Sequence, residues 1–138
     1  MLLYSKEAID KTSEWIDGNP SAKYWLLENN FEELVLLKDA ACRHTKAIES
    51  LLIKKHFILV TFVSAVWDDK KAFALLMDKK EFIWAAMANF INGDDKAAIF
   101  LKNSKLQHFA ELAFKIQTKI KNEGDKGTNF FRSGPYKP

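Results

Sequence analysis

An Ala and a Leu four residues apart recur along this chain of 138 residues with a period of 25. The four pairs are Ala22 and Leu26, Ala47 and Leu51, Ala72 and Leu76, and Ala97 and Leu101. Residues four apart lie on one face of an α-helix, so each pair predicts a short helix with one buried side. Equal helical units bury their apolar faces against one another, and the sequence therefore predicts an all-α fold of stacked units.

A second, longer helix is predicted in each unit. A short polar interruption follows each Leu, and an apolar segment then opens at Phe31, Phe57, Phe82 and Phe109. The units are expected as antiparallel hairpins at about 21–43, 46–67, 70–92 and 95–121, after an N-terminal cap helix over 2–17. Residues suited to N-capping the short helices are Ser21, Thr45, Asp69 and Asp95.

The length is that of one domain, which we place at 1–122. The segment that follows carries three Gly and two Pro, so an irregular tail is predicted over 123–138. Phe130 and Phe131 distinguish this tail from an ordinary solvated chain end, which makes them candidates for an interaction surface.

The alternation of short and long helices over about 21–122 resembles the helical hairpins of ankyrin-type repeats. The Thr-Pro-Leu-His signature and the Gly between the two helices of that family are missing here. The unit is also shorter than an ankyrin repeat, which has roughly 33 residues, and it leaves no room for the β-turn finger. We therefore expect a short α-solenoid-like or irregular helical array.

Composition narrows the class of partner and the compartment. Among 21 basic residues, Arg43 and Arg132 are the only arginines, which argues against a nucleic-acid reader. Cys42 is the only cysteine and excludes an intrachain disulfide, so a reducing, cytoplasmic location is expected. The longest uncharged run, Phe57 to Trp67, is about half the length of a membrane-spanning helix, and no membrane association is expected.

No motif for catalysis, a metal or a cofactor is evident. His108 and Glu111 form a single pair at ligand spacing, where a metal site in a helical protein needs several such pairs. Cys42 lies two residues before His44, but a lone Cys on an apolar helix is typically a small buried hydrophobe. We therefore assign no catalytic, metal-binding or cofactor-binding residue and expect no cofactor.

Lysines recur in the predicted turn between the two helices of successive units: Lys54, Lys55, Lys79, Lys80 and Lys105. A regular array would align these turns in a basic row along one edge. Such a row would keep the protein soluble, or it would dock an acidic partner by speeding association.

Three functions remain open. The leading hypothesis is a small protein-interaction or adaptor domain whose partner is another protein, or a second copy bound through the apolar central helices. The alternatives are a ligand-binding protein or enzyme, with a pocket between hairpins lined by Trp25, Trp67 or Trp84, and a weak polyanion or nucleic-acid binder that uses the lysine row. The segment Phe57 to Trp67 is apolar all round, so its outer face needs a cover.

Overall fold

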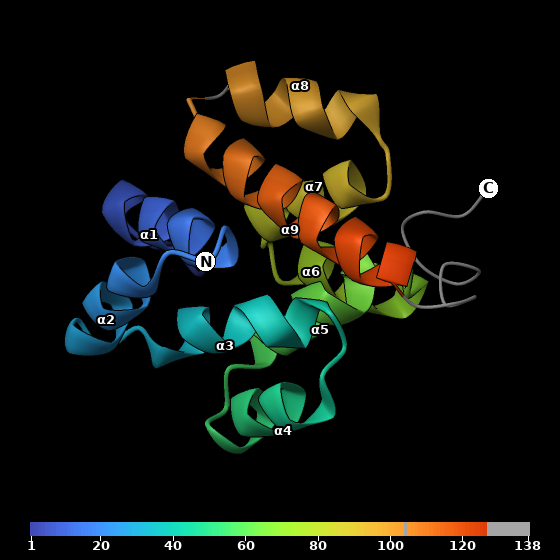
Figure 1. The fold of residues 1–138 in the computed structure, drawn as a ribbon. Coiled ribbons are helices and arrows are strands. Elements are labelled where there is room, and N and C mark those ends of the chain that lie inside the picture. Colours follow the sequence, from blue (N-terminus) through green and yellow to red (C-terminus); the bar gives the residue numbers. More distant parts are fainter. Residues whose placement is uncertain (104, 127–138) are drawn as a thin grey trace.

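The structure is a computed structural model, and it describes residues 1–103 and 105–126. Within these residues the chain forms nine α-helices, in which short and long helices alternate (Figure 1). In chain order they are α1 (Lys6–Ile16), α2 (Pro20–Glu28), α3 (Glu32–Ala41), α4 (Thr45–Ile53), α5 (Phe57–Val66), α6 (Lys70–Asp78), α7 (Phe82–Ile91), α8 (Asp95–Asn103) and α9 (Gln107–Lys126). The predicted all-α fold of helical hairpins is confirmed.

The five odd-numbered helices form a closed ring. Each of them packs against the next odd-numbered helix in sequence, and α9 packs against α1. Figure 1 shows α1 beside α9, with α2, α4 and α8 at the periphery. The helix predicted as an N-terminal cap is thus a member of the ring: Ile9 and Ile16 stand one repeat period before Leu34 and Ala41 of α3 and are buried like them.

Both turns of every hairpin end the preceding helix in the same way. The residue after the C-cap has a positive φ, at 18, 43, 68 and 93 after the long helices and at 30, 55, 80 and 105 after the short ones. In the turn from α4 to α5, for example, the Lys55 N–H donates to Leu52 O at 3.0 Å and the His56 N–H to Leu51 O at 2.9 Å. This pair of bonds is the Schellman motif, and its repetition keeps the period of the units constant.

The N-caps keep this period but differ from the predicted residues at three of four helices. The caps of α2, α4 and α6 are Asn19, His44 and Asp69, and the Asp94 carboxylate accepts the Lys96 N–H at the start of α8. Only Asp69 agrees with the prediction. The cap falls on the first residue after the Schellman turn, and at the other three helices this residue precedes the predicted cap.

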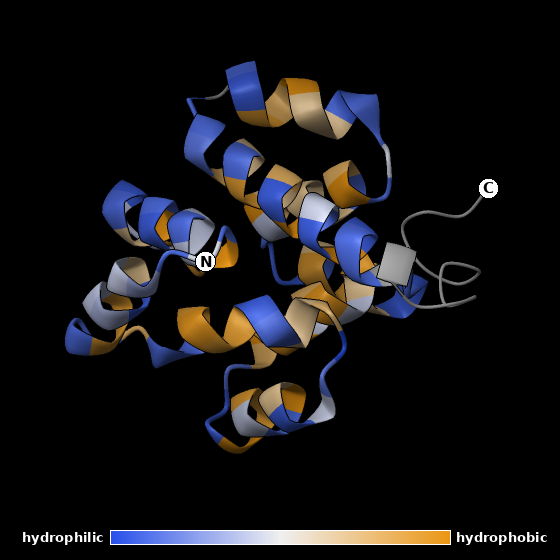
Figure 2. Ribbon diagram, viewed as in Figure 1, coloured by the Kyte–Doolittle hydropathy of each residue, from blue (hydrophilic) through white to orange (hydrophobic). Residues whose placement is uncertain are grey.

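The core fills the centre of the ring with aromatic and branched side chains. Trp84 is fully buried, and its ring lies edge-on to Phe62 at 5.1 Å and to Phe109 at 6.2 Å between centroids. Figure 2 shows mostly hydrophilic residues on the visible outer side of α9 and hydrophobic residues where the long helices meet. The centre of the ring is therefore a packed core.

The apolar segment that forms α5 is covered by the chain itself. This helix packs against α3, α4, α6 and α7. Its residues are buried or partly buried except Phe57, which is 56% exposed at the first position. The outer face of the segment thus needs no second molecule.

Side-chain donors tie each of the last three long helices to the end of the preceding one. Trp67 donates its indole N–H to Ala41 O at 2.8 Å, Asn92 its amide to Val66 O at 3.2 Å, and Gln117 its amide to Ile91 O at 3.1 Å. The three donors are one period apart, and each acceptor lies 26 residues before its donor. These bonds satisfy carbonyls at helix C-termini, which have no partner within their own helix.

The last helix is longer than predicted. It continues to Lys126, beyond the boundary placed at 122, because Lys121, Asn122 and Glu123 extend it without a break. Gly124 is accommodated within the helix. Phe130 and Phe131, predicted as interaction residues of the tail, lie outside the described residues.

Candidate functional site

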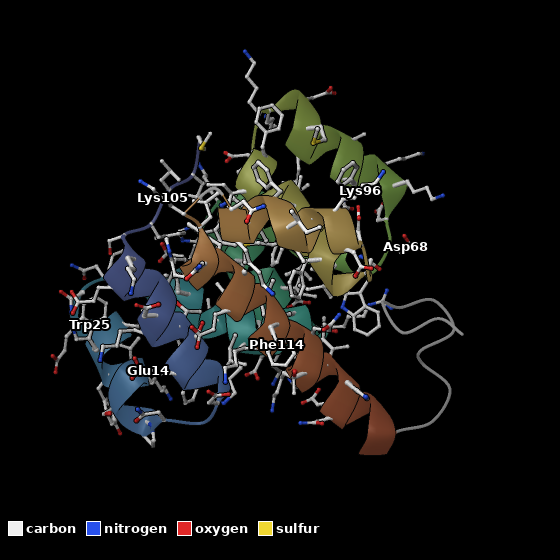
Figure 3. All side chains as sticks on the ribbon, turned by 90° about the horizontal axis from the view of Figure 1, so that it is seen from above. Glu14, Trp25, Asp68, Lys96, Lys105 and Phe114 are labelled. Atoms are coloured by element: carbon white, nitrogen blue, oxygen red, sulfur yellow. The ribbon has the colours of Figure 1, made fainter. Side chains whose placement is uncertain are left out.

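The turns between short and long helices lie at the opposite end of the molecule from the turns between long and short ones. In Figure 3, Lys105 lies on one side, whereas Asp68 and Lys96 lie on the other. Lys55, Lys80 and Lys105 occupy the same left-handed position of three successive turns, with φ of 65°, 60° and 60°. Because α5 packs on α7 and α7 on α9, these turns belong to neighbouring helices.

Large apolar side chains accompany the lysines in two of these turns. Phe57 is 56% exposed at the start of α5, and Phe82 is 43% exposed at the start of α7. Leu52, Ile53 and Met77 at the ends of the preceding short helices are exposed as well. Figure 2 shows the hydrophobic end of α4 where the chain turns into α5. We call the following set the apolar-basic edge: Leu52, Ile53, Lys54, Lys55, Phe57, Met77, Lys79, Lys80 and Phe82.

At the starts of the two flanking long helices the exposed position is polar, although Leu27, the counterpart of Leu52 and Met77 in α2, is also 41% exposed. The residues that correspond to Phe57 and Phe82 are Glu32 at the start of α3 and Gln107 at the start of α9. The counterpart of Leu52 and Met77 in α8 is Lys102. Polar residues thus flank the two exposed rings at the long-helix starts, and polar residues around an apolar centre are usual in protein interfaces.

The charge at this edge is positive, with one lysine already paired. Lys54 forms an ion pair with Glu32 of the neighbouring unit, whereas Lys55, Lys79 and Lys80 are exposed in their turns. Neither α5 nor α7 has a side-chain cap at its N-terminus. Since the N-terminus of a helix carries a partial positive charge, α5 adds to the positive potential of the edge, whereas the Glu81 carboxylate at the N-cap of α7 opposes it there.

Sequence reasoning found the lysines of this edge but missed its apolar half. The available signal was the phase of the repeat: Phe57 and Phe82 are one full period apart, but Phe31 stands one position too early to match them. The counterpart of Phe31 is therefore His56, and Phe31 is half-buried between the rings of Tyr4 and Trp25. From the sequence alone, the first Phe of every long helix was assigned to the same core position, and the exposure of Phe57 and Phe82 was therefore missed.

Apart from the apolar-basic edge, a polar cluster joins the turn before α4 to the C-terminal part of α9. His44 Nε2 lies 3.5 Å from Glu123 Oε2, and His44 Nδ1 lies 3.8 Å from Asp39 Oδ1. Burial, together with the charge of Glu123 and a hydrogen bond to it, raises the pKa of the Cys42 thiol to about 12. The thiolate is the nucleophilic form, so this environment works against a catalytic cysteine.

The raised pKa has a measurable consequence for the reactivity of Cys42. At pH 8 we expect iodoacetamide to modify Cys42 at least tenfold more slowly in the folded protein than in the urea-unfolded chain, as followed by mass spectrometry. Glu123→Gln should speed the reaction of the folded protein, because it removes the negative charge that opposes the thiolate. Equal rates in the folded and unfolded chains would contradict this environment for the thiol.

The hollows of the described surface are open to solvent, and the one with the largest volume is lined mostly by polar residues. One of about 580 Å³ lies between the end of α1 and α9, where Lys115 pairs with Asp17 at 2.8 Å. Of the tryptophans that could have lined a ligand pocket, Trp84 is fully buried in the core and Trp67 is 8% exposed. Trp25 is stacked on Phe31. This packing gives no support to the alternative of a deep ligand pocket.

Metal-binding clusters and membrane-spanning helices are both absent from the part of the chain that the structure describes. No group of three or more His, Cys, Asp or Glu side chains there is arranged to hold a metal ion. None of the described helices combines the length and the apolar character that crossing a membrane requires. Comparison of the chain with protein-family models, with curated proteins and with solved structures finds no match.

Proposed function

We propose that this chain is a small protein-interaction domain, which docks a partner with acidic and apolar side chains on the apolar-basic edge. The observation that carries the proposal is the exposure of Phe57 and Phe82 at corresponding positions of two helices that pack together. Neither ring contributes fully to the core of its own chain, although a Phe gains roughly 1.5–3 kcal/mol when it is fully buried.

The lysines beside the two rings define the chemistry of the partner. Lys55 and Lys80 lie two residues before Phe57 and Phe82, so an acidic group of the partner meets a positive charge wherever its apolar group meets a ring. Charge complementarity of this kind mainly raises the association rate and selects the partner, whereas burial of the rings supplies affinity. An acidic amphipathic peptide segment fits both demands.

The test uses peptides selected by phage display on the immobilised full-length chain. We expect the selected sequences to combine Asp or Glu with aromatic or large aliphatic residues. An edge variant that carries Phe57→Ser, Phe82→Ser, Lys55→Glu and Lys80→Glu should bind them at least tenfold more weakly. A matched variant with exposed residues changed elsewhere, Tyr24→Ser, Phe114→Ser, Lys46→Glu and Lys96→Glu, should bind like the parent chain.

The same two variants separate the competing functions. Selected peptides that bind the edge variant as tightly as the parent would refute the proposal, as would the absence of any binding peptide. Binding of a single-stranded DNA oligonucleotide that the lysine changes abolish and the phenylalanine changes spare would assign the edge to a polyanion instead. Concentration-dependent mass in sedimentation equilibrium, lost only in the edge variant, would assign it to a homodimer.

A further inference from the structure

The first five residues form an extended strap across the N-terminal end of α7. Side chains in this strap alternate between the two sides: Met1 is 68% and Leu3 is 61% exposed, whereas Leu2 and Tyr4 pack against the core. Alternation with a period of two is the pattern of an extended chain. The strap belongs to no helix, and it joins α1 through Ser5, the N-cap of that helix.

The backbone of Leu2 is held by side chains far away in sequence. Its N–H donates to both carboxylate oxygens of Glu81, at 2.8 and 3.0 Å. Its carbonyl accepts the indole N–H of Trp84 at 2.9 Å. Glu81 thus accepts from the Leu2 backbone N–H, and Trp84 donates to the Leu2 backbone carbonyl. Because both hydrogen bonds are made to the backbone, they do not depend on the side chain of this residue.

Tyr4 occupies a specific pocket two residues further on. Its hydroxyl donates to Glu33 Oε2 at 2.9 Å, and its ring lies edge-on to Phe31 at 5.8 Å and to Trp84 at 6.2 Å. An aromatic residue with a hydrogen-bond donor suits this pocket. The surface beneath the strap therefore combines backbone recognition at Leu2 with side-chain selection at Tyr4.

Glu81 makes this surface suitable for exchange of its occupant. The residue is 5% exposed, and the hydrogen bonds found for its carboxylate in the described part of the chain are those from the Leu2 N–H. A buried carboxylate without a cationic partner is costly. When the strap leaves, water can reach the Glu81 carboxylate. Hydrogen bonds to water then replace part of what is lost with the Leu2 N–H, so the strap can be displaced at modest cost.

We propose that the surface beneath the strap is a binding slot for an extended peptide segment of a partner protein, and that residues 1–5 occupy this slot as a built-in ligand. The slot is formed by Glu33, Glu81, Trp84 and Phe31. It takes a segment with an aliphatic residue followed, two positions later, by a Tyr. The proposal goes beyond the apolar-basic edge, because it rests on the groups that the strap covers and on none of the exposed edge residues.

The test releases the strap in the full-length chain and supplies its sequence in trans. Leu2→Pro removes the N–H that Glu81 accepts, whereas Leu3→Pro leaves it in place and serves as the matched control. The probe is the acetylated and amidated peptide Met-Leu-Leu-Tyr-Ser, with binding measured by isothermal titration calorimetry. We expect the Leu2→Pro variant to bind this peptide at least tenfold more tightly than the parent or the Leu3→Pro variant, since the strap no longer competes.

Two modified peptides identify the contact. N-methylation at the first Leu, which corresponds to Leu2, should abolish binding to the Leu2→Pro variant, and N-methylation at the next Leu should spare it. Equal binding of the two modified peptides would overturn the proposal, as would a folded Leu2→Pro variant that binds no peptide.

Circular dichroism and the solution mass decide the remaining cases. A Leu2→Pro variant that fails to fold would make the strap an integral part of the core and would also overturn the proposal. A parent chain that dimerises, with a dimer that the peptide dissolves, would assign the slot to the strap of a second copy and overturn the assignment to a partner.

Discussion

Trp84→Ala should lower the free energy of unfolding by about 3–5 kcal/mol, the cost typical of removing a large aromatic side chain from a packed core. The side chain is fully buried and lies edge-on to the rings of Tyr4, Phe62 and Phe109. Its loss would also leave the Leu2 carbonyl without the indole N–H. A domain of this size is typically stable by roughly 5–15 kcal/mol, so the variant should lose a large share of its stability.

Urea unfolding followed by circular dichroism measures this effect. Phe82→Ala is the matched control, because it removes an aromatic ring two residues earlier on the same helix from a position that is 43% exposed. We expect the control to lose less than about 1 kcal/mol. Equal losses for the two variants would show that Trp84 does not occupy the centre of the core.

Asn92→Ala should lower the free energy of unfolding by about 1–3 kcal/mol, because it leaves the Val66 carbonyl at the end of α5 without its side-chain donor. The Asn92 amide donates to Ala88 O in its own helix and to Ala65 O and Val66 O at the end of α5. The cost comes mainly from Val66 O, since Ala65 O still accepts the Asp68 N–H at 3.0 Å and Ala88 O the Asn92 N–H at 3.1 Å. Thermal and urea unfolding both report it.

The matched control for this variant is Asn89→Ala. Asn89 lies on the same helix, three residues before Asn92, and is also partly exposed. No hydrogen bond of its amide side chain is found within the described residues, so we expect a change of less than about 0.5 kcal/mol. If the two variants lost the same stability, the bonds between successive units would not be what stabilises this junction.

The local repeat could be predicted from the sequence because helical periodicity is a local property. Ala22, Leu26 and their counterparts mark buried faces that neighbouring residues alone define, and they are buried in the structure. The exposure of Phe57 and Phe82 could not be predicted in the same way, because it depends on the phase of the repeat. The Schellman turns set this phase through positive φ at positions such as Lys55, where no Gly marks the turn.

Contacts between distant parts of the chain were beyond the reach of local patterns. The hydrogen bonds from the Leu2 N–H to Glu81 span 79 residues, and Glu81 reads in the sequence as one more exposed charge of a polar turn. Likewise, α1 carries the same apolar spacing as the other long helices, but no pattern in its residues shows that α9 lies beside it. Whether α9 meets α1 depends on the small rotation between successive units. These rotations add up over the whole array, so no single unit determines the contact.

The contact between α1 and α9 sets a limit on how this protein can vary. An open stack of repeats can gain or lose units at its ends, because each unit touches only its neighbours. In the ring, one more unit would separate the first and last long helices and expose the faces that they now bury. Within the described residues every long helix has a neighbour on both sides, so the units should unfold together. Although the sequence is repetitive, the contact between α1 and α9 fixes the number of units in this ring.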